Sequence, residues 1–290
     1  MIKVYFVLML GIISVSFAAI FVRFCDDVPA IMIATYRLVI ASTILNILYF
    51  RKNKERFKFQ KKDFIFGFFG GVFLSLHFIA WLQSLKYTSV ASSLVLLSTG
   101  PIFVSIVSYL ILKEKQDKEI IIAIVFAIAG SAVLAFGDAN FEVRFGENAL
   151  IGDGFAIMAA FFVSLYFLIG SHLRERMDIM SYIVLVYTVA AVFLLIVSLV
   201  LQIPFTGYEL RSYIFMVLLA LVSQNLGHTS FNWALKYLKT SMVAIITLGE
   251  PVIGSILAYL IFGESIDKYK FIGIILIFAA IIIASRKGKK

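Results

Sequence analysis

The sequence of 290 residues is poor in several features that other protein classes need. Its single cysteine, Cys25, excludes an intrachain disulfide framework and a cysteine cluster for zinc or iron–sulfur binding. Charged residues form only 15% of the chain, against about 25% in soluble domains. P-loop, GxSxG and HExxH motifs are absent, so we expect no enzyme, no ATPase, no catalytic residues, no metal and no cofactor.

Apolar residues are abundant instead, at 62% of the chain. They form runs of roughly twenty residues, which predict membrane-spanning α-helices rather than the shorter alternating strands of a β-barrel. The predicted fold is an all-α polytopic membrane protein with ten transmembrane helices, including an uncleaved first helix in preference to a signal peptide. These helices are expected near residues 4–22, 30–50, 64–85, 89–112, 119–137, 150–171, 181–202, 213–235, 240–262 and 271–285.

The net charge of +9 lies mostly in short loops, which favours membrane anchoring over nucleic-acid binding. If the N-terminus is cytoplasmic, nineteen Lys and Arg residues fall on the cytoplasmic side and six on the other, with Arg37 inside a span. Because basic residues concentrate in cytoplasmic loops, both termini are predicted to be cytoplasmic. The predicted location is the cytoplasmic (inner) membrane.

An internal repeat divides the chain into two halves. An offset of 150 residues aligns 85–87 (LKY) with 235–237 (LKY) and Pro101 with Pro251, while an offset of 148 aligns Ser16 with Ser164. The predicted halves are residues 1–137 and 150–290, joined by an extracytoplasmic linker at 138–149. Five helices in each half give the second copy the opposite orientation, as in secondary transporters that work by alternating access.

Two related motifs carry a resemblance to a known family. Gly100-Pro101 precedes 109–114 (YLILKE) in the first half, and Glu250-Pro251 precedes 259–264 (YLIFGE) in the second. With Gly152-Asp153 and Arg37, these motifs make the chain resemble the drug/metabolite transporter superfamily, in particular the type with two EamA domains. The resemblance implies transport of amino acids, nucleobase-related compounds or other small metabolites.

Polar side chains within the predicted spans are the candidate site residues, because a charge at mid-membrane usually faces a cavity or a partner. Arg37 is a candidate anchor for an anionic substrate group, with helix bracing as the alternative. His77 and Trp81 lie four residues apart and therefore share a helix face. The resemblance places the binding cavity partly along their helix, although packing would also explain both residues.

The eighth predicted helix carries a polar stripe of Gln224, His228 and Asn232 at four-residue steps. Such a stripe favours the lining of an aqueous path, with hydrogen bonding between helices as the alternative. Tyr166 and Tyr36 are further pocket candidates on their own helices.

Glu250 is the only acidic residue expected deep within a span, and Pro251 follows it directly. Coupling to protons and recognition of a substrate ammonium group are the functional hypotheses for Glu250, whereas an ion pair with Arg37 is the structural one. Pro251 and its repeat partner Pro101 are expected to kink their helices. Glycines on these helices, among them Gly67, Gly71, Gly130 and Gly254, are expected to allow close helix packing.

The function expected from the sequence is secondary transport of a small-molecule substrate by alternating access, with export of an amino acid or related compound as the leading case. His77, Trp81, His228 and Asn232 would bind this substrate in a central cavity between the halves. A channel, or a membrane-embedded sensor or assembly factor, is the alternative. The lipid bilayer is the expected surrounding partner, and substrate identity, proton coupling and oligomeric state stay open.

Overall fold

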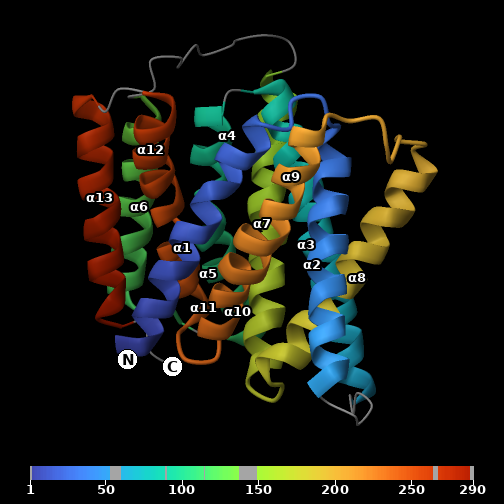
Figure 1. Cartoon of the computed structure of the whole chain (residues 1–290). Coiled ribbons are helices and arrows are strands. Elements are labelled where there is room, and N and C mark those ends of the chain that lie inside the picture. Colours follow the sequence, from blue (N-terminus) through green and yellow to red (C-terminus); the bar gives the residue numbers. More distant parts are fainter. Residues whose placement is uncertain are drawn as a thin grey trace. The chain divides into compact units, whose positions relative to one another are not determined.

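The computed structural model describes residues 2–52, 60–88, 90–113, 115–136, 149–263 and 267–287, and within them the chain is all-α (Figure 1). Each of the ten predicted segments is helical there, and helix ends fall within roughly three residues of those expected. Glu114, Glu264, linker residues 138–148 and tail residues 288–290 lie outside the described residues. The helices are α1 (Ile2–Arg23), α2 (Ala30–Lys52), α3 (Lys61–Tyr87), α4 (Val90–Leu97), α5 (Gly100–Leu112), α6 (Lys118–Phe136), α7 (Ala149–Arg174), α8 (Ile179–Val200), α9 (Leu210–Leu218), η1 (Leu219–His228), α10 (Thr229–Ala234), α11 (Thr240–Thr247), α12 (Gly249–Phe262) and α13 (Lys268–Ser285).

Nine segments of the described chain are long and apolar enough to cross a membrane. Each contains an apolar window of 18 residues, and a rise of 1.5 Å per residue gives such a helix a length of about 27 Å. This length approaches the hydrocarbon thickness of a bilayer, about 30 Å. Helix α6, with 19 residues, is the remaining predicted segment.

The chain forms two compact units, and neither coincides with a half of the sequence. The first unit contains Met1–Ile79 and Ile169–Lys236, and the second contains Ala80–Leu168 and Tyr237–Lys290. Each unit therefore takes helices from both predicted repeats. Within each unit, helices that occupy equivalent places in the two repeats pack against each other: α2 on α8 in the first, and α6 on α13 in the second.

Both pairs of equivalent helices run antiparallel. Near the start of α2, Thr35 Oγ1 lies 2.9 Å from Ser198 Oγ near the end of α8. Near the end of α2, Tyr49 OH lies 3.3 Å from Ser181 Oγ at the start of α8. These hydroxyl groups pair across the two helices, where a membrane would provide little water to bond them.

Glycines set the close approach of α6 to α13 in the second unit. A Cβ atom at Gly130 would lie 2.9 Å from Ile277 Cγ1, and one at Gly273 would lie 2.6 Å from the backbone nitrogen of Leu134. The order of these contacts, 130 with 277 and 134 with 273, shows the antiparallel direction. The predicted packing role is confirmed for Gly130, but a Cβ at Gly254 would meet no described atom within 4 Å.

In two predicted spans the helix is interrupted shortly before a proline. The fourth is divided at Ser98 and Thr99 into α4 and α5, and the ninth is divided at Leu248 into α11 and α12. Pro101 and Pro251 each lie close to the start of the second piece. A proline is tolerated there because the first N–H groups of a helix have no intrahelical partner.

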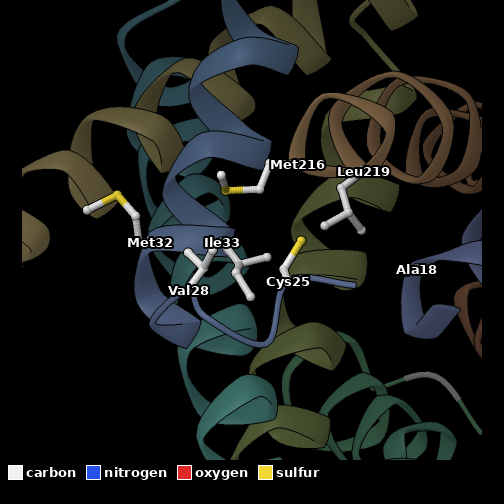
Figure 2. Close-up of a cluster of buried hydrophobic side chains, with 7 residues drawn as sticks. All are labelled: Ala18, Cys25, Val28, Met32, Ile33, Met216 and Leu219. Atoms are coloured by element: carbon white, nitrogen blue, oxygen red, sulfur yellow. The ribbon is translucent and has the colours of Figure 1, made fainter. Parts of the chain in front are cut away.

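At one end of the first unit, the α1–α2 loop packs against the start of α9. Figure 2 shows the buried cluster at this end, formed by Ala18, Cys25, Val28, Met32, Ile33, Met216 and Leu219. Beside it, Asp27 accepts hydrogen bonds from Ser212 Oγ at 2.5 Å and from the backbone N–H of Glu209 at 2.7 Å. Since Glu209 is the N-cap residue of α9, Asp27 caps this helix from a distant part of the sequence.

Candidate functional site

Arg37 lies at the centre of a buried polar cluster in the first unit. Its Nε donates to Gln224 Oε1 at 2.8 Å, and this bond joins α2 to η1. Its guanidinium carbon lies 4.2 Å from the ring centroid of Phe78 on α3, a cation–π geometry worth about 0.5–2 kcal/mol. Arg37 is 3% exposed, so these contacts hold a charged group away from solvent.

Both candidate histidines of the first unit flank the same Phe78 ring. The ring centroid of His77 lies 5.1 Å from that of Phe78, and the centroid of His228 lies 5.5 Å from it. Phe231 lies 6.1 Å from His228 and adds a second aromatic wall. The sequence predicted both histidines but did not single out Phe78, because one phenylalanine among 29 carries no distinguishing signal.

Two atoms of this cluster have no hydrogen-bond partner among the described residues: Gln224 Nε2 and His228 Nδ1. Gln224 is fully buried and His228 is 6% exposed. Most buried polar atoms in proteins are hydrogen-bonded, because leaving one unpaired costs about 1–3 kcal/mol. These two unpaired atoms make the cluster a candidate binding site within the first unit.

Asn232 extends the polar region towards α8. Its Nδ2 donates to Tyr187 OH at 3.2 Å, and the same hydroxyl lies 3.4 Å from Thr229 Oγ1. Arg174 Nε donates to the backbone carbonyl of Asn232 at 3.2 Å. Arg174 follows the predicted helix 150–171 and is one of the nineteen basic residues counted on the cytoplasmic side, yet it is 2% exposed.

A π-helix carries the polar stripe. The eighth predicted span comprises α9, η1 and α10, and η1 is a π-helix from Leu219 to His228. Such helices are uncommon, and short π segments often occur at functional sites. Gly227 of η1 allows α1 to approach, since a Cβ there would lie 2.4 Å from Val15 Cγ2. The π-helix could not be predicted from the apolar pattern, because that pattern is compatible with both an α-helix and a π-helix.

Three other candidate residues, Trp81, Tyr166 and Glu250, belong to the second unit. Trp81 follows His77 by one turn on the continuous helix α3, and its Nε1 has no hydrogen-bond partner within the described ranges. Tyr166 is fully buried in α7, 5.4 Å from the ring of Phe167. Glu250 lies half-buried in the first turn of α12, where a carboxylate is favoured by the helix dipole.

Ser164 supports the first-half helix break. Its Oγ donates to the carbonyl of Gly100 at 2.9 Å, so α7 contacts the backbone directly before Pro101. The remaining pocket candidate, Tyr36, lies at the periphery of the first unit. Its hydroxyl donates to the carbonyl of Phe205 at 2.7 Å, and it therefore packs beside the Figure 2 cluster.

Among the described residues, nine helical segments are candidate membrane spans, and the first unit holds a buried polar cluster. The model of the EamA-like transporter family matches residues 2–136 and 150–286, and the chain belongs to this family. It is therefore an integral membrane protein of a transporter family within the drug/metabolite transporter superfamily, and not an enzyme. Its two matches correspond to duplicated halves.

Curated relatives carry transporter names. An "Uncharacterized transporter" of Clostridium kluyveri is 30% identical over 212 residues, covering 71% of this chain and 67% of that protein. "Uncharacterized transporter YetK" of Bacillus subtilis is 27% identical over 91% of this chain and 81% of its own. Mouse "Solute carrier family 35 member G1" is 27% identical over 79% of this chain and 64% of its own. One crystal structure matches with a TM-score of 0.83 at 14% identity over 98% of this chain and 96% of its own, which supports the fold alone.

Proposed function

We propose that this transporter moves a small polar metabolite, an amino acid or a related compound, across the membrane by alternating access, with export as the direction. The observation that carries the proposal is the buried polar cluster of the first unit, with the unsatisfied atoms Gln224 Nε2 and His228 Nδ1. Carriers place their substrate sites among polar groups of discontinuous or distorted helices. The π-helix η1 provides such a distortion directly at both residues.

The cluster offers donors and an apolar wall together. The Gln224 amide and the Arg37 guanidinium can donate to a carboxylate or carbonyl, while His228 can donate or accept according to its tautomer. Phe78 and Phe231 form the aromatic side. This combination suits a small molecule that has one polar end and one apolar part. His77 and Asn232 lie at the edges of the same cluster and are the proposed secondary contacts, and Trp81 and Tyr166 stay predicted contributors.

Alternating access is supported by the arrangement of the repeats. Equivalent helices run antiparallel within each unit, as α2 and α8 do, and this agrees with inverted repeats. The breaks before Pro101 and Pro251 interrupt equivalent spans of the two halves, and such breaks are suitable hinge points. Glu250, in the first turn of α12, is the proposed group for proton coupling.

The proposed topology has ten crossings, with α6 as the tenth, and both termini on the cytoplasmic side of the inner membrane. The distribution of basic residues supports this orientation. Reporter fusions at residue 290 test it: a fusion that is active only in the cytoplasm agrees with the topology, whereas activity only on the other side overturns it.

Counterflow into proteoliposomes tests the proposed transport. Purified protein would be reconstituted with a panel of unlabelled amino acids, nucleobases and small amines inside, and the same labelled compounds outside, with and without a pH gradient. Saturable uptake that internal substrate accelerates supports a carrier, and dependence on the gradient supports Glu250 as the coupling group. Uptake that is linear in concentration and insensitive to internal substrate indicates a channel. Absence of flux across the whole panel, with folded protein verified, favours the sensor alternative.

A further inference from the structure

A second feature of the first unit is a cavity between α3 and α8. This cavity has a volume of about 600 Å³, within the range of small-molecule sites. We call it the α3–α8 groove and define it by Phe64, Phe68 and Val72 on α3, and Val192, Phe193 and Ile196 on α8. Among the described residues that line it, only Asn46 and Thr188 are polar, and none is charged.

Two glycines bring α3 close to α8 beside the groove. A Cβ at Gly71 would lie 2.7 Å from the carbonyl oxygen of Val186, and one at Gly67 would lie 2.2 Å from Leu185 Cδ2. Because glycine has no side chain, the α3 backbone packs directly on α8 at this crossing. The bulky rings of Phe64 and Phe68 stand at the edge of the crossing and form one wall of the groove.

The groove opens towards lipid. Its mouth residues Phe64, Phe68, Val192 and Ile196 are about half exposed, and they belong to the candidate spans Lys61–Tyr87 and Ile179–Val200. Hydrocarbon chains are the molecules that surround such spans. The polar pair inside is already satisfied, because Asn46 Nδ2 donates to Thr188 Oγ1 at 2.8 Å. The interior is therefore suited to an apolar chain rather than to an aqueous solute.

One end of the groove is basic. Lys61 and Lys62 are exposed at the start of α3, three and two residues before Phe64. Arg176 is also partly exposed at this end, where its guanidinium lies 3.1 Å from Asp63. Basic residues beside the end of a membrane span attract anionic lipid headgroups, by about fivefold in affinity for each residue near the surface. We infer that the α3–α8 groove binds one acyl chain of an anionic phospholipid whose headgroup lies against Lys61 and Lys62.

Native mass spectrometry of the purified full chain tests this inference, with phosphatidylglycerol and phosphatidylcholine of identical acyl chains as probes. Wild-type protein should retain one phosphatidylglycerol in preference to phosphatidylcholine by at least fivefold. Val192→Trp, which fills the groove mouth, should reduce retention about tenfold. Val125→Trp is the matched control, because Val125 is an exposed valine of α6 in the second unit. The double variant Lys61→Gln/Lys62→Gln should lose the preference for phosphatidylglycerol but should still bind the lipid's acyl chain.

Three results would overturn the inference. Equal retention of the two lipids by wild-type protein would remove the headgroup site. Equal retention by Val192→Trp and Val125→Trp would remove the groove as the binding place. Lipid-free dimers that only Val192→Trp dissociates would assign the groove to contact with a second copy of the chain.

Discussion

The packing of α3 on α8 gives a sharp prediction, because it depends on the missing side chain of Gly71. In Gly71→Ala the new Cβ would lie 2.7 Å from two rigid neighbours, the carbonyl oxygen of Val186 and Val189 Cβ. Overpacking of this kind costs about 1–3 kcal/mol. The matched variant is Gly154→Ala in α7, where a Cβ meets no described atom within 4 Å.

Both substitutions replace glycine by alanine inside a helix, so both gain the same helix propensity, about 1 kcal/mol. This gain cancels in the comparison, and the expected stability gap between the two variants is the overpacking cost alone. Gly71→Ala should therefore melt several degrees below Gly154→Ala, on the order of 5 °C. The assay is thermal unfolding in one detergent, followed by size-exclusion chromatography. If Gly71→Ala melts at or above Gly154→Ala, the described contact of α3 with α8 is wrong.

Three further predictions concern the ends of the first unit. Hydrogen bonds from Ser212 and from the backbone N–H of Glu209 lower the pKa of Asp27, so its contribution is present above pH 4 and is lost as pH falls through the folded-state pKa. Asp27→Asn should lower the melting temperature at pH 7, and this difference from wild type should shrink steadily as pH falls below 4. Burial, followed by nearby acidic charges, raises the pKa of the Cys25 thiol to about 12; maleimide at pH 7 should label this single cysteine only after unfolding. Arg174→Lys should lose a charged hydrogen bond worth about 1.5–3 kcal/mol, so it should unfold at a lower concentration of denaturing detergent than wild type. Arg176→Lys, at an exposed position, should unfold at nearly the wild-type concentration.

Each of these predictions has a defined contrary outcome. A stability difference for Asp27→Asn that does not change with pH would show that the capping bond is unimportant. Rapid labelling of Cys25 in folded protein would contradict the packing in Figure 2, and an engineered cysteine at exposed Val200 in a Cys25→Ala background verifies the reagent. Equal stability of Arg174→Lys and wild type would remove Arg174 as a brace of α10.

Much of the fold follows from hydrophobic length and charge alone. Runs of about twenty apolar residues bounded by basic breaks fix where helices begin and end, and the predicted 30–50 corresponds to Ala30–Lys52. The helix interruptions before Pro101 and Pro251 agree with proline chemistry, and kinks at these positions stay a prediction. The division into two compact units was not predictable, because pairing of α2 with α8 depends on contacts more than a hundred residues apart.

The candidate site was predictable in its polar members but not in its supporting ones. A histidine or arginine within an apolar run stands out because its burial is costly, and Arg37, His77, Gln224 and His228 were found in this way. Phe78 has no such signal, since aromatic residues occur throughout the chain. Arg174 was missed because basic residues at helix ends usually lie in solvent, and only tertiary structure shows its burial.

The central claim is that the polar cluster around Gln224 binds the transported substrate, and one measurement tests it most directly. Counterflow of the best substrate from the panel would be compared between wild type, Gln224→Leu and the control Ser230→Ala. The Ser230 Oγ donates to the carbonyl of Leu226 one turn earlier in the chain. Loss of a buried hydrogen bond should weaken the apparent affinity of Gln224→Leu at least tenfold, with Ser230→Ala unchanged. Equal saturation curves for correctly folded wild type and Gln224→Leu would contradict the claim.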